Sequence, residues 1–268
     1  MIKFFRADKN DVAQLKKLWL ECFDDTEEAT DLFFDKNWRW MRAFCAKDKN
    51  KVVSALYLIE AALNGCKAHY LCGASTKSDY RKRGIMAGLI DFALEAAKHD
   101  GDKFSVLMPA NLSLYDYYAG FGYMAQCFAE KRIFSRDELL AVCDCSSEYN
   151  YNFEQLQAVS FNKNFLLWNN EYRKFACDYY RLYGAVAIST NDCFALFEEE
   201  NGCAEVFYAV SANEGVLAKR LLENSSAERF IIIGKANENS NKEKYGMIKS
   251  LDNNMKIPND VFIGITLM

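Results

Sequence analysis

The chain has 268 residues, of which 51% are hydrophobic and 26% are charged, and its formal net charge is −4. This length fits one large domain or two small ones, and the hydrophobic fraction is sufficient for a core. The weakly acidic balance argues against a nucleic-acid partner. No segment approaches the roughly 20 apolar residues of a membrane span, and the N-terminus lacks a signal-peptide block, so we expect a cytoplasmic protein without membrane contact.

The first half predicts a strand-rich fold with one long amphipathic helix. Asn64-Gly65 is a two-residue hairpin signal between apolar runs, and the acidic stretch at 24–31 reads as a connection. The buried strand after the long helix should be parallel to the strand before it. The predicted elements are, in order, a strand at 2–7, a helix capped by Asp8 or Asn10, strands at 42–47, 52–63 and 66–76, the long helix at about 85–99, a strand at 103–108, a short helix within 109–123 and a strand at 124–134.

The second half repeats this order more loosely. Asn201-Gly202-Cys203 lies at a turn that corresponds to Asn64-Gly65-Cys66. A helix at about 213–223 and a buried strand at 229–234 follow, so strand, hairpin, helix and strand occur twice and predict an internal duplication. The polar stretch at 143–152 predicts a boundary, and 235–246 reads as a loop. We therefore expect two domains, at 1–145 and 146–268.

Ten cysteines raise the question of a metal or disulfide framework. Most lie singly in apolar runs, as Cys45, Cys177 and Cys193 do, where a thiol behaves as a small hydrophobic side chain. Cys143 and Cys145 form the only close pair, and the chain has only two histidines. We therefore expect reduced thiols and no metal site.

The stretch Arg81-Lys82-Arg83-Gly84 places three cations directly before the long helix. Helix starts usually carry Ser, Thr, Asp or Asn and acidic residues instead. A helix N-terminus offers unpaired N–H groups and a partial positive charge, which suit a phosphate, and Gly84 allows close approach of the backbone. The pattern is neither a P-loop nor a dinucleotide fingerprint. From these residues alone, a solvated basic loop remains the alternative.

Two motifs together resemble those of the GNAT acetyltransferases. "YRKRGIM" is similar to that family's (R/Q)-x-x-G-x-(G/A) acyl-CoA loop, and "NLSLYDYYAGFGY" is similar to its second signature, N-x-x-(A/S)-x-x-(L/Y)-Y-x-x-x-G-F/Y. Their order relative to the hairpin, helix and buried strand also matches over residues 1–135. The resemblance implies a mixed α/β fold of the α+β type, in which two parallel central strands splay apart within a mixed sheet flanked by helices.

Met86 departs from the family's usual Gly or Ala at its position. The tandem-domain branch that resembles the enhanced-intracellular-survival acetyltransferases commonly has a large apolar residue there. On the first helical turn, such a side chain can point toward the sheet. That branch also carries a degenerate second GNAT-like domain, which the duplication matches, while its third domain has no room in this length. Glu214 stands where the first copy has a cation, so we expect the second copy not to bind CoA.

The resemblance implies acetyl-CoA as co-substrate and no metal. Strand residues would pair with the pantetheine amides as an added strand does, and the basic loop would hold the pyrophosphate. Asn111 and Ser113 would meet the cofactor near the second splayed strand. The residues assigned to acetyl-CoA in this way are Ala74, Ser75, Thr76, Lys82, Arg83, Gly84, Ile85, Met86, Ala87, Asn111 and Ser113.

Tyr118, four residues before Gly122, matches the family's general-acid position. An amine would attack the thioester directly, and Tyr118 would protonate the leaving CoA thiolate. Tyr115 and Tyr117 are alternative donors, and all three tyrosines can instead be packing residues.

The residue that removes the proton from the amine is left open. Glu60, Glu28 and Asp25 are candidates, as are water and, by resemblance, the terminal carboxylate of Met268.

Three functions remain compatible with these patterns. The leading hypothesis is an acetyl-CoA-dependent N-acetyltransferase that acts on an amine of a small molecule or peptide. The second is a non-catalytic acyl-CoA-binding regulatory protein, in which the tyrosine is only structural. The third is an interaction module that binds no CoA. The sequence does not identify the acceptor or the oligomeric state.

Overall fold

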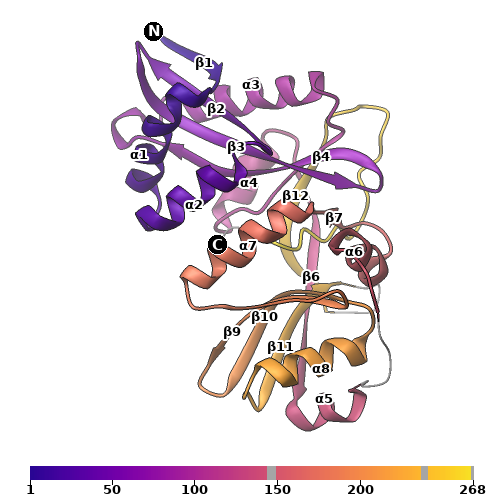
Figure 1. The fold of residues 1–268 in the computed structure, drawn as a ribbon. Helices are drawn as coiled ribbons and strands as arrows, with labels where there is room; N and C mark the ends of the chain where they lie inside the picture. Colours follow the sequence, from indigo (N-terminus) through magenta and orange to yellow (C-terminus); the bar gives the residue numbers. More distant parts are fainter. Residues whose placement is uncertain (144–148, 237–240, 267–268) are drawn as a thin grey trace. The chain divides into compact units, whose positions relative to one another are not determined.

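The computed structural model describes residues 1–143, 149–236 and 241–266, which form two compact units (Figure 1). The first unit contains Met1–Ala125 and Gly246–Ile257, and the second contains Gln126–Tyr245 and Pro258–Thr266. Each unit has strands of both orientations with helices beside them. The predicted mixed α/β class is confirmed.

In the first unit the strand order is β1-β2-β3-β4-β5-β12, and only the β4–β5 pair is parallel. The strands are β1 (Ile2–Arg6), β2 (Met41–Asp48), β3 (Lys51–Leu63), β4 (Cys66–Thr76), β5 (Phe104–Leu107) and β12 (Glu243–Ser250). The helices are η1 (Lys9–Asp11), α1 (Val12–Cys22), α2 (Glu27–Asn37), η2 (Ser78–Tyr80), α3 (Ile85–His99) and α4 (Ser113–Ala119).

The alternation of side chains along β3 divides the core of this unit into two layers. Leu56 and Leu58 join the apolar stripe of α3, whereas Tyr57 faces the opposite side. There, the Tyr57 ring lies 5.5 Å from the rings of Trp19 in α1 and Phe33 in α2. Complete burial of each such side chain contributes roughly 1.5–3 kcal/mol, so both faces hold the sheet.

Helix α2 corrects the sequence interpretation of residues 24–31 as a connection. The Thr26 hydroxyl accepts a hydrogen bond from the Ala29 N–H at 3.0 Å and caps the helix. Glu27 and Glu28 follow in the first turn, where the helix dipole favours acidic residues. The acidic stretch is therefore a helix start.

In the second unit the strand order is β6-β11-β10-β9-β8, and only the β10–β11 pair is parallel. The strands are β6 (Met124–Ser135), β7 (Leu166–Leu167), β8 (Val186–Ser189), β9 (Cys193–Glu200), β10 (Cys203–Ser211) and β11 (Arg229–Lys235). The helices are α5 (Arg136–Val142), α6 (Phe153–Phe161), α7 (Asn170–Leu182) and α8 (Glu214–Asn224).

The two predicted hairpins form with the same turn conformation. Asn64 and Gly65 have φ of 50° and 77°, and Asn201 and Gly202 have φ of 51° and 75°. Two positive φ values in succession characterise the type I′ turn, which matches the twist of the flanking strands. In both units a parallel strand follows the hairpin through one helix, so the repeated order of elements is confirmed.

The path of the chain differs from a simple division into halves. The expected boundary at 145–146 lies outside the described residues. The first crossing between units instead falls inside β6, because residues 129–135 of this strand pair with β11. A second crossing falls inside β12, in a stretch expected to be a loop, because Met247–Ser250 pair with β5.

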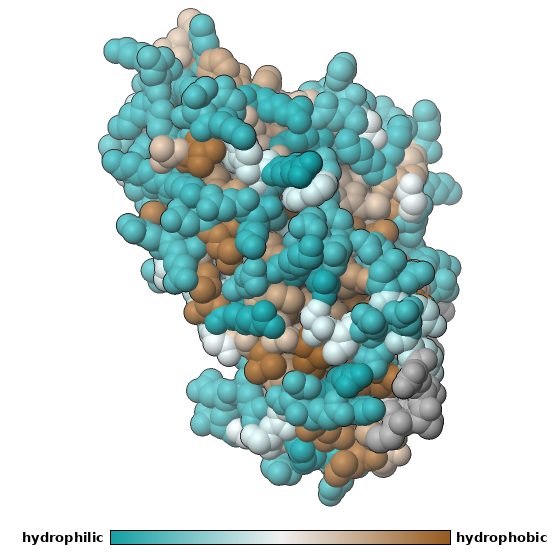
Figure 2. Space-filling view, in the orientation of Figure 1, coloured by the Kyte–Doolittle hydropathy of each residue, from teal (hydrophilic) through white to brown (hydrophobic). Residues whose placement is uncertain are grey.

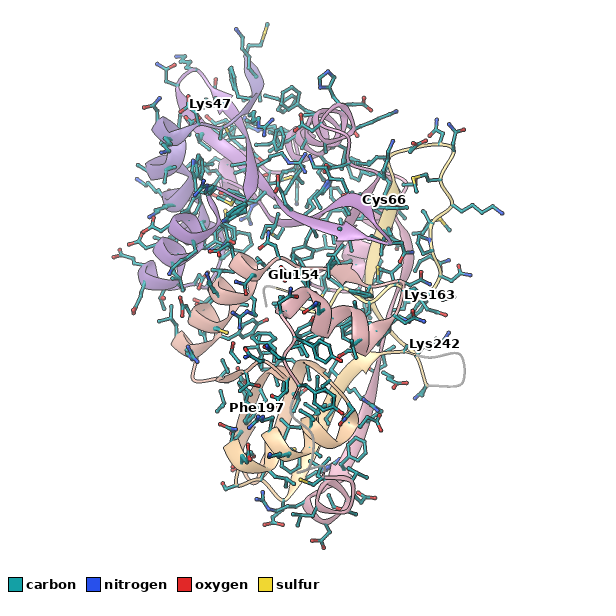
Figure 3. All side chains as sticks on the ribbon, turned by 45° about the vertical axis from the view of Figure 1, so that its right-hand side comes forward. Lys47, Cys66, Glu154, Lys163, Phe197 and Lys242 are labelled. Carbon is teal, nitrogen blue, oxygen red and sulfur yellow. The ribbon has the colours of Figure 1, made fainter. Side chains whose placement is uncertain are left out.

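Hydrophilic residues cover most of the face shown in Figure 2, with smaller apolar patches between them. Figure 3 labels two partly buried lysines, Lys47, which pairs with Asp11 in the first unit, and Lys242, which pairs with Asp260 in the second. Over the described part of the chain, the helices are too short or too polar to cross a bilayer.

Candidate functional site

The site in the first unit is built where β4 and β5 part. Their parallel register runs from Ala68 opposite Phe104 to Tyr70 opposite Val106, and no further pair follows among the described residues. β4 nevertheless continues to Thr76 and stays paired with β3 on its other side. Beyond Tyr70, the second edge of β4 is therefore open to a ligand that pairs as a strand does.

A bulge sits in this open segment of β4. Gly73 and Ala74 have no partner in the register with β3. Gly73 has a φ of +60°, and a Cβ there would lie 2.6 Å from the Trp19 ring and 2.7 Å from the Tyr57 ring. Both the conformation and the close approach therefore require glycine. The Ala74 side chain packs against the α3 layer.

The last two residues of β4 are fixed by side chains. The Ser54 hydroxyl donates to the Ser75 carbonyl at 2.9 Å and lies 2.8 Å from the Thr76 hydroxyl. The Thr76 carbonyl accepts from the Arg81 Nε at 2.9 Å. The Ser75 Oγ is buried and has no hydrogen-bond partner in the part of the chain that the structure describes. Such an orphaned polar atom costs stability, which fits a site that a ligand completes.

The loop after β4 delivers the chain to α3 through two residues of positive φ, Lys82 at 60° and Gly84 at 72°. No side chain of the described residues caps α3, and its first turn has no acidic residue. The first intrahelical bond joins the Gly88 N–H to the Gly84 carbonyl at 3.0 Å. The three preceding N–H groups, of Ile85, Met86 and Ala87, are thus left for an outside acceptor. We call this end the open N-terminus of α3.

The space around the open N-terminus is accessible and positively charged. A Cβ added at Gly84 would have no atom within 4 Å. Arg81, Lys82 and Arg83 are all exposed. The Arg83 guanidinium lies 5.1 Å from the centre of the Tyr80 ring, which holds it beside the loop. The partial charge of the helix dipole adds to these three cations.

The side chains that open α3 point into the protein. Ile85 is 7% exposed within an apolar cluster, and Met86 packs against the α3 layer. The expectation that Met86 turns toward the sheet is therefore confirmed. Only backbone N–H groups remain at the helix end, so the large side chain does not obstruct it.

Asn111 and Ser113 lie together at the start of α4. The Asn111 Oδ1 accepts hydrogen bonds from the Ser113 N–H at 3.1 Å and the Ser113 hydroxyl at 2.6 Å. Both residues are exposed. The pair therefore fixes the entry of α4, and the Asn111 amide remains at the surface.

Tyr118 of α4 is 8% exposed and packs edge-on against Tyr117 and Tyr123, at ring distances of 5.3 Å and 6.0 Å. Its hydroxyl makes none of the hydrogen bonds found among the described residues, and it is not one of the fully buried polar atoms without a partner. Burial, with smaller contributions from Tyr117 and Cys72, raises the pKa of Tyr118 to about 12. The phenol is therefore fully protonated at neutral pH, which is the state of a proton donor.

The other two tyrosines of α4 are placed differently. Tyr117 is 38% exposed, and burial together with Asp91 raises its pKa. Tyr115 packs against the α3 layer. Tyr118 is therefore the most deeply buried of the three tyrosines of α4.

The candidate bases differ in exposure and in the hydrogen bonds that their carboxylates already accept. The Asp25 carboxylate accepts from the Trp19 Nε1 at 2.9 Å and from the Thr26 N–H at 3.2 Å, so it is committed to holding α1 and α2. Glu28 is exposed in the first turn of α2, and Glu60 is half-buried on β3. Met268 lies outside the described residues.

Sequence reasoning missed a buried polar cluster in this unit. Asp102 contacts the Arg42 guanidinium and the His69 Nδ1, and all three side chains are buried. Burial alone would raise the pKa of Asp102, but the hydrogen bonds from His69 and Arg42 hold it at about 2. Burial lowers the pKa of His69. A neutral His69 thus donates to an ionised Asp102, which ties the C-terminal end of α3 to β2 and β4.

The helix of the second unit that corresponds to α3 begins differently. The Asn213 side chain accepts from the Val216 N–H at 2.8 Å and caps α8. Glu214 follows in the first turn and forms an ion pair with Arg132 at 2.8 Å. This end therefore has a side-chain acceptor and a negative charge of its own, and it lacks the anion-binding properties of α3.

The described residues contain no cluster of three or more His, Cys, Asp or Glu side chains that could hold a metal ion.

Parted parallel strands, an open helix N-terminus and a helix with three tyrosines thus occur together in the first unit. A family model for an acetyltransferase (GNAT) domain matches residues 3–125. The matched residues, which lie within the first unit, thus resemble a GNAT acetyltransferase domain. None of the curated proteins matches the chain.

Solved structures match nearly the whole chain. A GCN5-related N-acetyltransferase from Anabaena variabilis is 12% identical with a TM-score of 0.70, over 94% of this chain and 73% of that one. One from Kribbella flavida is 14% identical with a TM-score of 0.62, over 93% and 70%. Eis1 from Mycobacterium abscessus is 9% identical with a TM-score of 0.61, over 94% and 74%. The predicted resemblance to the tandem-domain branch is thus confirmed at the level of the fold.

Proposed function

We propose that this protein is an acetyl-CoA-dependent N-acetyltransferase that transfers an acetyl group directly to an amine. The observation that carries the proposal is the open N-terminus of α3 within a GNAT domain. Three N–H groups, the helix dipole and the cations of residues 81–83 converge there, with no carboxylate in the first turn. Hydrogen bonds to a charged acceptor contribute roughly 1.5–3 kcal/mol each, so this end favours a pyrophosphate strongly.

We assign the pyrophosphate to residues 82–87. The N–H groups of Ile85, Met86 and Ala87 would donate to its oxygens, and Gly84 would let the backbone approach closely. Lys82 and Arg83 would add opposite charge. The basic residues that the sequence singles out thus have a physical role beyond solvation.

We assign the pantetheine arm to the open edge of β4. Ala74 lies in the bulge, so its peptide groups are best placed to pair with an amide. The Ser75 carbonyl is held by Ser54, but its orphaned Oγ can accept a ligand donor. The Thr76 carbonyl would become available only if Arg81 exchanged it for the phosphates. The exposed Asn111 and Ser113 would contact the cofactor from the start of α4.

The chemistry would follow from these positions. The amine nitrogen attacks the thioester carbon, and a backbone N–H in the β4 bulge stabilises the negative charge that develops on the carbonyl oxygen. As the C–S bond breaks, Tyr118 donates its proton to the departing sulfur. Burial raises the pKa of Tyr118, and it would also raise the pKa of the CoA thiol in the same surroundings. The two pKa values therefore stay close enough for the proton to pass from the phenol to the sulfur.

The attacking amine must be neutral, although free alkylammonium groups have a pKa near 10. We propose Glu60, Glu28, the terminal carboxylate or water as the proton acceptor, and we rank Asp25 below them. The Asp25 oxygens already hold Trp19 and Thr26, so their use as a base would loosen the α1–α2 connection.

Replacement of Tyr118 by Phe tests the assignment. We expect kcat with any accepted amine to fall by roughly 100-fold, the usual contribution of a general acid, with KM for acetyl-CoA little changed. Tyr117→Phe is the matched control on the same helix and should change kcat less than threefold. Equal losses in both variants, or none in Tyr118→Phe, would contradict Tyr118 as the proton donor, whereas binding of acetyl-CoA by the wild type without turnover of any amine would favour the non-catalytic acyl-CoA-binding alternative.

A further inference from the structure

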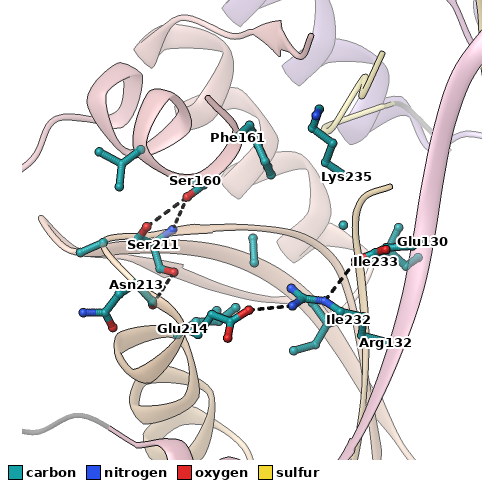
Figure 4. A pocket seen from close by; sticks show the side chains of 15 residues that line it. Glu130, Arg132, Ser160, Phe161, Ser211, Asn213, Glu214, Ile232, Ile233 and Lys235 are labelled. Atoms are coloured by element: carbon teal, nitrogen blue, oxygen red, sulfur yellow. Dashed lines mark hydrogen bonds and ion pairs between the residues drawn. The ribbon is translucent and has the colours of Figure 1, made fainter. Parts of the chain in front are cut away.

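The second unit contains a cavity of about 440 Å³ to which no role has been assigned. It lies where β10 and β11 part. Their parallel register ends with Val206 opposite Ile232, yet β10 continues to Ser211 and β11 to Lys235. Figure 4 shows the cavity between these strands, the end of α6 and the start of α8. Its volume lies within the range of small-molecule sites and is too small for a whole CoA.

Part of the open edge of β10 is already occupied from within the unit. The Ser160 hydroxyl of α6 donates to the Ser211 carbonyl at 3.0 Å and accepts from the Ser211 N–H at 2.9 Å. Because peptide direction alternates along an antiparallel ladder, the Ala209 peptide groups point toward the cavity as well. The peptide groups of Ala209 therefore stay available to a ligand, whereas α6 already occupies those of Ser211.

The cavity has two unlike ends (Figure 4). At one end the Arg132 guanidinium pairs with two carboxylates, Glu214 at 2.8 Å and the buried Glu130 at 3.6 Å. At the other end lies Lys235, which is half-buried and has no ion-pair partner among the residues that the structure describes. Phe161 and Leu217 provide apolar wall between them. The described lining thus carries two carboxylates and one guanidinium at one end and the single ammonium group of Lys235 at the other.

The surroundings of Lys235 strengthen this positive end. Burial lowers the pKa of Lys235, and the nearby charges of Lys163 and Lys242, labelled in Figure 3, lower it further. Asp260 acts in the opposite sense, but it is already paired with Lys242 at 2.8 Å. Among the described residues, these three ammonium groups thus share the one carboxylate of Asp260. A bound anion would relieve this imbalance, whereas a cation would increase it.

We infer that this cavity binds a small carboxylate with a short apolar chain, its head at Lys235 and its chain along Phe161 and Leu217. A phosphate fits less well, because Asn213 caps α8 and, of the described lining residues, only Lys235 is a cation without an ion-pair partner. The inference concerns the second unit alone and does not depend on acetyl transfer by the first.

Hexanoate is the probe, and calorimetric titration of the full chain is the measurement. Hexylammonium has the same chain with the opposite charge and should not bind. Lys235→Gln should weaken hexanoate binding by about tenfold or more, whereas Lys244→Gln, which changes an exposed lysine away from the cavity, should leave it unchanged. Gly234→Leu should abolish binding by filling the cavity, since Gly234 lines it and a Cβ there meets nothing closer than 4.0 Å.

Circular dichroism of each variant checks that the fold is retained, and Lys235→Gln alone decides the matter if Gly234→Leu does not fold. Absence of hexanoate binding to the wild type at millimolar concentration would overturn the inference. Equal binding of hexanoate and hexylammonium, or unchanged binding in Lys235→Gln, would also overturn it.

Discussion

Gly84 offers the sharpest test of the open N-terminus of α3, because two nearly isosteric substitutions separate charge from shape. Gly84→Asp places a carboxylate beside the proposed pyrophosphate, whereas Gly84→Asn places a neutral group of the same size there. Both meet open space, and both must adopt the same φ of 72°. Asn and Asp tolerate this conformation better than other residues do. Any difference between the two variants therefore reports the charge.

The size of the difference follows from Coulomb's law. At roughly 7 Å and an effective dielectric constant near 20, each pair of unit charges costs about 2 kcal/mol. We therefore expect Gly84→Asp to bind acetyl-CoA roughly 30-fold more weakly than Gly84→Asn, with a smaller ratio at high salt.

Thermal melts with and without acetyl-CoA provide the assay. For the wild type, ligand at 100 times its Kd should stabilise the protein by about 2.7 kcal/mol. Gly84→Asn should keep most of this shift, whereas Gly84→Asp, which binds roughly 30-fold more weakly, should keep only about 0.9 kcal/mol of it at the same ligand concentration. Equal shifts in the two variants would refute the assignment of the pyrophosphate to this helix end.

Further predictions concern stability. Gly73→Ala should lower the free energy of unfolding by about 2–4 kcal/mol, because its Cβ would overlap the Trp19 and Tyr57 rings. Urea unfolding measures this loss, and a value below about 1 kcal/mol would contradict the prediction. Asp102→Asn should lower the free energy of unfolding by about 1.5–3 kcal/mol, because Arg42 and His69 lose their charged partner while Asp100 still pairs with Arg42 at 3.2 Å; unchanged stability would contradict this. The pKa of Asp102 in the folded state, about 2, lies below its unfolded value near 3.9, so its contribution is complete above pH 4 and is lost as pH falls toward 2. Melting temperatures should therefore fall less steeply over pH 4–2 in Asp102→Asn than in the wild type; parallel curves would count against the buried pair.

The sequence was informative where the cause of a structure is local. The φ values at Asn64-Gly65 and Asn201-Gly202 follow from the residues themselves, and so do the hairpins. The inward position of Met86 follows from helical periodicity. The basic loop was also recognisable, because the absence of a capping residue before Ile85 is visible in the sequence.

Features with distant causes escaped sequence reasoning. The pairing of β6 with β11 joins residues about a hundred positions apart, and no local pattern reveals that β6 belongs to the second unit. The polar stretch that contains β12 becomes a strand only because β5 offers it an edge. Arg42, His69 and Asp102 are likewise separated in the chain, so their shared cluster appears only in the fold.

One miss had an available local signal. Thr26-Glu27-Glu28 is a helix start by the usual rules, with a hydroxyl cap followed by acidic residues in the first turn. The run of acidic side chains obscured this cap. Phe33 and Phe34, which α2 buries against Trp19, lie just beyond the acidic stretch at 24–31.

Transfer of isotopically labelled acetyl from acetyl-CoA to a panel of primary amines and peptides, followed by mass spectrometry, tests the central claim most directly. The account predicts labelled N-acetyl product with at least one acceptor, and its loss in Tyr118→Phe but not in Tyr117→Phe. Binding of acetyl-CoA without label on any acceptor would contradict acetyl transfer and leave a protein that binds acyl-CoA without turning it over.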